Sequence, residues 1–174
     1  MVYIKSTNLV LRTILSKDID FLYAVENDNT YYHLSDSYGP YTREDLMLYI
    51  TKASVPLKIA KQYRFVICLP DDTPIGFVDL FNYNEEKQDL GLGIIIYNKK
   101  QRNKGFAKKA IQLLKEYCFE RLAINTIKAS VLDDNKNSLL LFTQLGFKKR
   151  STGIRWNSYL QEHKTLVYFT LNKK

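Results

Sequence analysis

The sequence has few residues of the types that bind metals or form disulfides. Its 174 residues include only two cysteines, Cys68 and Cys118, and two histidines, His33 and His163. The cysteines lack the paired spacing of a zinc site or a redox motif. Two imidazoles are too few for a multi-histidine metal centre. We therefore expect two buried free thiols and no bound metal.

Long apolar runs are also missing. No segment approaches the roughly 20 apolar residues that a membrane-spanning helix requires. The first residues, MVYIKSTNLVLR, lack the basic stretch and long apolar stretch of a secretory signal. We expect a cytoplasmic protein without a membrane partner. The length and a hydrophobic content of 45% favour one globular domain over residues 1–174.

Positive charge, in contrast, is abundant. The chain has 26 Lys and Arg against 18 Asp and Glu, which gives a net charge of +8. Such an excess attracts anions such as nucleic acids or phosphorylated cofactors. Much of it falls in residues 99–109, which contain Lys99, Lys100, Arg102, Lys104, Lys108 and Lys109. A nucleic-acid interface is a remote alternative, because no basic surface interleaved with aromatic residues is evident. We expect no nucleic-acid partner.

The hydrophobic periodicity predicts mixed strands and helices in one α+β fold with α/β/α layers. Helices are expected at 16–29 with Ser16 as N-cap, after a cap at Thr42 with Asp45, from 104 onward, and at 135–145 before Gly146. Strands are expected at 7–14, 63–69, 75–83, 89–97, 126–132 and 163–171. The three strands between 63 and 97 are expected to form an antiparallel meander.

The stretch QRNKGFAKKA, residues 101–110, connects an apolar strand to the long helix. The start of a helix presents main-chain N–H groups without partners, and the helix dipole is positive there. Gly105 permits a close approach of the main chain, and Ala107 keeps the first turn small. We expect a phosphate site, although an ordinary turn with a solvated basic face is an equal alternative. The GxxxxGK[ST] and GxGxxG nucleotide motifs are both missing.

The pattern Arg102-x-x-Gly105-x-Ala107 resembles the (Q/R)xxGx(G/A) pyrophosphate loop of the GCN5-related N-acetyltransferases (GNAT). The stretch DDNKNSLLLFTQLGFKKR resembles the second signature of this family, and the two signatures together span residues 91–150. The stretch LVLRTILSKDIDFLYAVEND is similar to the opening of the branch that contains ribosomal-protein N-terminal and spermidine/spermine acetyltransferases. The resemblance implies a mixed, largely antiparallel sheet with a splayed central strand pair.

The resemblance also implies acetyl-coenzyme A as cofactor, coenzyme A as product, and direct attack by an amine in a ternary complex. It implies contacts to the pantetheine arm from the main chain of Ile94, Ile95 and Ile96 and from Asn135, and further cofactor contacts from Ser138 and Phe142. It implies contacts to the pyrophosphate from Arg102, Asn103, Lys104, Gly105, Phe106 and Ala107. Two alternatives stay open: the isoleucines are simply buried sheet, and Asn135 is the N-cap of a helix.

The expected chemistry requires a proton acceptor. A lysine-type amine has a reference pKa of about 10.4 and is mostly protonated at neutral pH. The candidate bases are Asp89, Asp79, Glu85 and Glu86, with Asp89 first because it begins the cofactor strand. The alternative for Asp89 is a solvated acid at a strand end. A main-chain N–H of Ile95 or Ile96 is the expected oxyanion donor.

The departing thiolate has no evident proton donor. Many relatives carry a tyrosine four residues before the glycine of the second signature, where this chain has Phe142. A different phenol, from Tyr97, Tyr83 or Tyr159, is one replacement, and Tyr97 is the candidate catalytic residue. We favour departure without an acid, because a thiol pKa of about 8.5 makes a tolerable leaving group. A coenzyme A sensor or regulatory relative with impaired catalysis is the alternative function.

The acceptor is expected to be a small polyamine-like amine or a protein N-terminus. Acids and aromatic rings suit a cationic amine, and they gather in the helix and loop between residues 16 and 41. The expected acceptor-binding residues are Glu26, Asp36, Tyr38 and Asp79, with Asp28, Tyr31, Tyr32 and Tyr41 nearby. A solvated polar loop is the alternative. The protein is expected to be a monomer or a homodimer.

Overall fold

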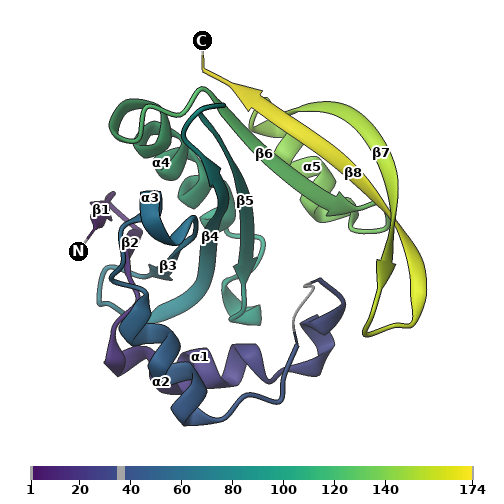
Figure 1. The fold of residues 1–174 in the computed structure, drawn as a ribbon. Helices are drawn as coiled ribbons and strands as arrows, with labels where there is room; N and C mark the ends of the chain where they lie inside the picture. Colours follow the sequence, from purple (N-terminus) through teal and green to yellow (C-terminus); the bar gives the residue numbers. More distant parts are fainter. Residues whose placement is uncertain (1, 35–37, 174) are drawn as a thin grey trace.

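The computed structural model describes residues 2–34 and 38–173. The described strands form one eight-stranded sheet in the order β1-β2-β3-β4-β5-β6-β8-β7 (Figure 1). All neighbours are antiparallel except β5 and β6, which are parallel. The strands are β1 (Tyr3–Lys5), β2 (Val10–Thr13), β3 (Tyr63–Cys68), β4 (Pro74–Asn84), β5 (Asp89–Ile96), β6 (Thr126–Leu132), β7 (Lys148–Asn157) and β8 (Glu162–Asn172). The predicted mixed, largely antiparallel sheet is confirmed.

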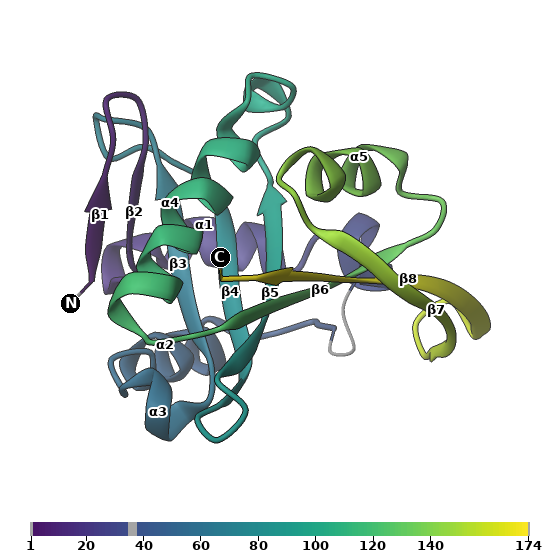
Figure 2. The same ribbon diagram turned by 90° about the horizontal axis from the view of Figure 1, so that it is seen from above.

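Helices cover both faces of the sheet. Apolar residues of α4 (Phe106–Arg121) and α5 (Lys136–Gln144) pack on one face, and those of α1 (Ile19–Glu26) and α2 (Arg43–Lys52) pack on the other. Seen from above, β3 and β4 lie between α4 and α1 (Figure 2). The shorter helices are α3 (Leu57–Ala60), η1 (Ser16–Asp18), η2 (Asn29–Leu34) and η3 (Lys99–Gln101). The layered α/β/α architecture is as predicted.

Local signals located most of these elements correctly. The meander of β3, β4 and β5 is confirmed, and so is the cap at Thr42, whose hydroxyl accepts the N–H of Asp45 at 3.1 Å. The predicted cap at Ser16 is wrong. Ser16 begins η1, and the Asp18 carboxylate accepts the N–H of Leu15 at 2.8 Å, so α1 begins only at Ile19.

Two strands were missed from the sequence, β1 and β7. The β7 sequence, KKRSTGIRWN, is almost entirely exposed and lacks the alternation of apolar residues that indicates a half-buried strand. It lies at the edge of the described sheet and pairs with β8. A polar edge strand needs no apolar face of its own, and charge on it discourages pairing with other chains.

The central strands β5 and β6 separate along their length. Their pairing covers only three positions, from Asp89 opposite Thr126 to Gly91 opposite Lys128. The pairing of β5 with β4 continues to Ile96, opposite Gly76. In Figure 1 the two strands lie together at one end and diverge toward the other. This divergence is the splayed pair that the resemblance implied, and we call the space between the strands the β5/β6 gap.

A buried ionic cluster fixes the start of α1 to the sheet. Arg12 of β2 is 4% exposed, and its guanidinium donates to both carboxylate oxygens of Asp18, at 2.7 and 2.8 Å. It also donates to Asp72 at 2.6 Å. These contacts, that with Asp18 foremost, raise the pKa of Arg12 despite its burial. Arg12 therefore stays charged and joins β2, η1 and the turn before β4.

Both cysteines are buried free thiols, as predicted. Burial raises the pKa of Cys68 and of Cys118 to about 12, so neither is a reactive thiolate at neutral pH. The described residues contain no group of three or more potential metal ligands. None of the helices within residues 2–34 and 38–173 is long and apolar enough to cross a membrane.

Candidate active site

The main chain of β5 faces the β5/β6 gap at alternate residues. The N–H of Tyr97 donates to the carbonyl of Ile75 at 2.9 Å, which places the main-chain groups of Tyr97 on the β4 side. Alternation along the strand puts those of Ile95 on the same side and those of Ile94 and Ile96 on the gap side. Of the two expected oxyanion donors, only Ile96 therefore faces the gap, and Ile94 is the other N–H there.

The side chains of the three isoleucines pack on the sheet faces. Ile94 and Ile96 pack against the core beneath α4, and Ile95 packs against the core beneath α1 and α2. All three are partly buried. Ile94 and Ile96 are therefore core residues by their side chains, and their main chain also lines the gap.

The loop between β5 and α4 has the geometry of an anion site. Asn103 and Gly105 have positive φ angles of 61° and 81°, and Gly105 is the N-cap of α4. The structure shows no hydrogen bond from the N–H groups of Phe106, Ala107 and Lys108 to any described residue. A Cβ at position 105 would meet nothing within 4 Å. Three donors thus lie at the positive end of a 16-residue helix, with open space before them.

The side chain of Arg102 forms hydrogen bonds within the protein. Its Nε donates to the carbonyl of Ile96 at 2.8 Å, and a terminal nitrogen donates to the hydroxyl of Tyr31 in η2. Lys104 contacts the side-chain oxygen of Gln101 at 3.2 Å and is exposed. Arg102 is therefore held by hydrogen bonds within the protein, whereas the side chain of Lys104 lies in solvent.

Two residues of the second signature have structural contacts in the described fold. The side-chain oxygen of Asn135 accepts the N–H of Ser138 at 3.1 Å and caps α5, as the alternative reading proposed. Phe142 is 4% exposed, and its ring lies 5.0 Å from that of Phe147 and 6.1 Å from that of Phe169. At the position where many relatives have a tyrosine, this chain has a core residue.

The two predicted catalytic residues lie at opposite ends of β5. They are eight residues apart, which corresponds to about 26 Å in an extended strand. Asp89 lies where β5 and β6 still pair, and it forms an ion pair with Lys128. The hydroxyl of Tyr97 donates to the carbonyl of Ala24 at 3.3 Å, and burial followed by Asp28 raises the pKa of Tyr97. Asp89 and Tyr97 therefore do not act together on one reacting centre.

The other candidate phenols and acids have contacts of their own in the described fold. Tyr83 is 6% exposed and is covered by Lys61, whose ammonium lies 5.2 Å from the ring centre. Glu85 pairs with Lys58 at 2.5 Å, and it shares an exposed turn with Glu86. Tyr159 belongs to a ring cluster at the turn between β7 and β8. Tyr83, Glu85 and Tyr159 are therefore held by contacts with Lys61, Lys58 and other tyrosines.

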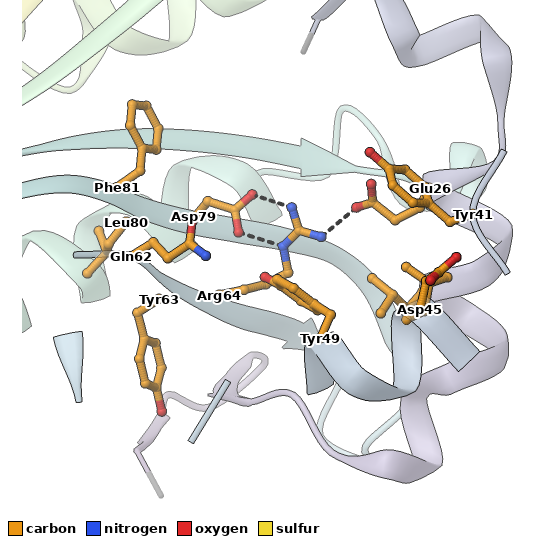
Figure 3. Close-up of a pocket in the computed structure, with 12 residues that line it drawn as sticks. Glu26, Tyr41, Asp45, Tyr49, Gln62, Tyr63, Arg64, Asp79, Leu80 and Phe81 are labelled. Carbon is orange, nitrogen blue, oxygen red and sulfur yellow. Dashed lines mark hydrogen bonds and ion pairs between the residues drawn. The ribbon is translucent and has the colours of Figure 1, made fainter. Parts of the chain in front are cut away.

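An acidic pocket of about 700 Å³ lies between α1, α2 and the strands β3 and β4 (Figure 3). We call it the acceptor pocket. Its charged lining residues are three acids, Glu26, Asp45 and Asp79, and one base, Arg64, so the lining carries −3 + 1 = −2. Such a charge favours a cationic ligand. Its aromatic lining consists of Tyr41, Tyr49, Tyr63 and Phe81.

Arg64 organises this pocket and was not anticipated from the sequence. It donates to both oxygens of Asp79, at 2.6 and 2.9 Å, and to Glu26 at 2.5 Å. Its guanidinium also lies 5.5 Å from the ring centre of Tyr49 and 5.0 Å from that of Phe77. Burial lowers the pKa of Arg64, but Asp79 and the other partners raise it above its usual value.

A sequence signal for this arrangement existed. Arg64 and Asp79 are direct cross-strand partners in the predicted meander, and opposite charges at such positions attract. Asp79 is also paired with Gly93 on its other side, two residues beyond the last β5/β6 pair. Of the expected acids, Asp79 is therefore the nearest along the sheet to the start of the gap.

The remaining expected acceptor residues are distributed differently. Glu26 lies in the pocket, whereas Asp36 lies outside the described residues. Tyr38 is not a lining residue, and its ring contacts Tyr32 at 5.7 Å and Tyr159 at 5.4 Å. The Phe81 ring lies against Gly91, where a Cβ would come within 2.3 Å of a ring carbon.

Comparisons with known proteins agree with this geometry. A family model described as an acetyltransferase (GNAT) domain matches residues 8–148. The chain belongs to this GNAT family. This confirms the resemblance carried by the two signatures, and it makes the protein an N-acetyltransferase of the acyltransferase class.

Relatives of this GNAT protein cover most of its length. The SPbeta prophage-derived uncharacterized N-acetyltransferase YokL of Bacillus subtilis (strain 168) is 24% identical over 84% of this chain and 80% of that protein. The structure of spermidine N-acetyltransferase from Vibrio cholerae, in complex with coenzyme A and spermine, superposes with a TM-score of 0.84 at 20% identity, covering 96% of both chains. A protein from Vibrio cholerae assigned as a ribosomal-protein-serine acetyltransferase gives 0.76 at 20% identity, covering 99% of this chain and 98% of that one. These structures share the fold.

Proposed function

We propose that this GNAT protein, as a single domain, transfers the acetyl group of acetyl-coenzyme A to a primary amine that carries positive charge. One observation carries the proposal. The β5/β6 gap ends at three N–H groups of α4 that have no partner among the described residues, and a pocket with a net charge of −2 lies on the α1/α2 face of β3 and of β4, the strand that pairs with β5. Acetyl-coenzyme A, the cofactor of the family, supplies the activated thioester.

The described residues fit this cofactor. The N–H groups of Phe106, Ala107 and Lys108, with the open space at Gly105, would hold the diphosphate. The gap-side N–H groups of Ile94 and Ile96 and the carbonyl of Ile94 would bind the pantetheine arm as an adjacent strand would, while the carbonyl of Ile96 accepts from Arg102. Binding would thus depend on the main chain, apart from the added charge of the exposed lysines.

The acceptor pocket would bind and deprotonate the amine. An amine with a reference pKa of about 10.4 must lose a proton before it can attack a carbonyl carbon. Asp79 replaces Asp89 as our candidate proton acceptor, since it lies opposite Gly93 at the start of the gap. Glu26 and Asp45 would hold the remaining positive charge of the amine. The thiolate would depart without an acid, because Phe142 is buried and Tyr97 hydrogen-bonds Ala24.

A panel of amines tests the proposal. Purified protein is mixed with acetyl-coenzyme A and polyamines, peptides with free N-termini, aminoglycosides or neutral amines, and the released thiol is measured. We expect turnover with cationic amines and little with neutral ones, and Asp79→Asn should lower kcat at least tenfold. Release with no member of the panel would contradict the proposal.

A second function is favoured by the burial of Phe142. The usual acid position is occupied by a core ring, which is compatible with a coenzyme A sensor or regulatory protein. Tight binding of coenzyme A measured by calorimetry, together with no thiol release from the whole panel, would support that function instead.

A further inference from the structure

Arg102 connects the loop between β5 and α4 (residues 97–105), which we call the phosphate loop, to η2, whose residues lie in the sequence between two lining residues of the acceptor pocket. Its guanidinium donates to the Ile96 carbonyl at 2.8 Å and to the Tyr31 hydroxyl, and it lies 5.5 Å from the centre of the Tyr31 ring. Tyr31 and Arg102 are 71 positions apart in the chain. The forked guanidinium can make these contacts simultaneously, which a lysine ammonium on a flexible stem does less well.

Tyr31 belongs to η2, and η2 separates two residues that line the acceptor pocket. Glu26 ends α1 just before η2, and Tyr41 follows η2 along the chain. The side chain of Asn27 fixes the position of Tyr41, because its oxygen accepts the Tyr41 N–H at 2.7 Å and its amide donates to the Tyr41 carbonyl at 3.2 Å. Glu26 is thus connected to η2 along the chain, and Tyr41 is connected to it through Asn27.

The other side of η2 is anchored to the turn between β7 and β8. The Tyr32 ring lies 5.2 Å from the Tyr159 ring in an edge-on arrangement. The buried side chain of Asn157 donates to the carbonyl of His33 at 2.8 Å. These contacts hold one side of η2, and the contact between Arg102 and Tyr31 holds the side that faces the phosphate loop.

We infer that Arg102 is a positioning residue for the acceptor pocket and that Tyr31 is its partner. When the phosphate loop binds a diphosphate, the side chain of Arg102 is held in one position. Its contact with Tyr31 then orders η2, and with it the two lining residues Glu26 and Tyr41. The inference rests on the proposed function for the identity of the two ligands. It assigns Arg102 a different role from the cofactor contact that its place in the sequence motif implied.

Two variants test the inference by kinetics. Tyr31→Phe keeps the ring and removes the hydroxyl, and Arg102→Lys keeps the charge and removes the fork. A hydrogen bond to a charged group is typically worth about a tenfold change in an equilibrium constant, or more. We expect each variant to raise the acceptor KM about tenfold, while the Kd for coenzyme A, measured by calorimetry, changes less than twofold. The double variant should be no worse than Arg102→Lys, because both changes break one contact.

The matched control is Tyr23→Phe, which removes a tyrosine hydroxyl from the exposed side of α1. Tyr23 is 38% exposed, and its ring contacts Arg43. This variant should leave both constants unchanged. Unchanged coenzyme A affinity also shows that each variant is folded. Equal losses of cofactor and acceptor affinity, or an unchanged acceptor KM in Tyr31→Phe, would overturn the inference.

Amide hydrogen exchange provides a measurement that needs no activity. We expect coenzyme A to slow exchange in residues 29–34 of the unmodified protein, and this protection should be lost in Tyr31→Phe and kept in Tyr23→Phe. If coenzyme A binds without protecting residues 29–34, the coupling is refuted. If protection is seen but no amine is acetylated, the proposed function fails and the role of Arg102 stands.

Discussion

The position of Gly105 in the phosphate loop leads to a quantitative prediction for coenzyme A binding. Replacing this residue with tryptophan places a large ring in the open space at the start of α4, next to three N–H groups that have no partner among residues 2–34 and 38–173. Hydrogen bonds to charged groups contribute about 1.5 to 3 kcal/mol each. Losing two of them therefore weakens coenzyme A binding by at least about 3 kcal/mol, or roughly a hundredfold in Kd.

The matched control is Gly105→Ala. Both variants place a side chain on a residue with a φ of 81°, and this conformation costs non-glycine residues about 1 to 2 kcal/mol. The two variants therefore share the loss of stability, which urea unfolding measures. They differ in the size of the group that occupies the phosphate space, which calorimetry with coenzyme A measures. If the Kd of Gly105→Trp stayed within threefold of that of Gly105→Ala, the assignment of the diphosphate to this helix start would be wrong.

Three further predictions concern stability. Asp18→Asn should lower the free energy of unfolding by about 3 kcal/mol, because it removes one partner of a buried arginine while Asp72 remains bound to Arg12; a loss under 1 kcal/mol in urea unfolding would contradict this. Lys17, and then Arg12, lower the pKa of Asp72 to about 2, so its stabilisation is present above pH ~4 and lost as the pH falls toward 2. Because Asp72 is partly exposed, this amounts to about 1 kcal/mol, and Asp72→Asn should flatten that part of the pH profile of Tm. Phe142→Tyr should not raise kcat and should lower stability by about 1 to 3 kcal/mol by burying a hydroxyl; an increase in kcat would show that the position reaches the thiol.

The features that the sequence predicted correctly depend on neighbours along the chain. The glycine that begins α4, the cap at Thr42 and the three strands of the meander each follow from residues within one short window. The cap at Asn135 was one of two open alternatives, because the same amide chemistry serves a helix end and a ligand.

The features that could not be predicted depend on where residues lie relative to one another in the folded structure. Asp89 and Tyr97 belong to one nine-residue stretch of sequence, but an extended strand places them about 26 Å apart. The attachment of Arg102 to Tyr31 and of Arg64 to Glu26 requires knowing which segments meet across the sheet. Composition drew attention to Glu26 and Asp79, which line one pocket in the structure, but it could not show that an arginine already neutralises part of their charge.

The contact of Phe81 with Gly91 connects the cofactor strand to one wall of the acceptor pocket. The Phe81 ring fills the room that a methyl group at position 91 would need, and Phe81 also lines the pocket. Any larger residue at position 91 would therefore have to displace this ring. The missing side chain on β5 is thus a condition for the aromatic wall on β4.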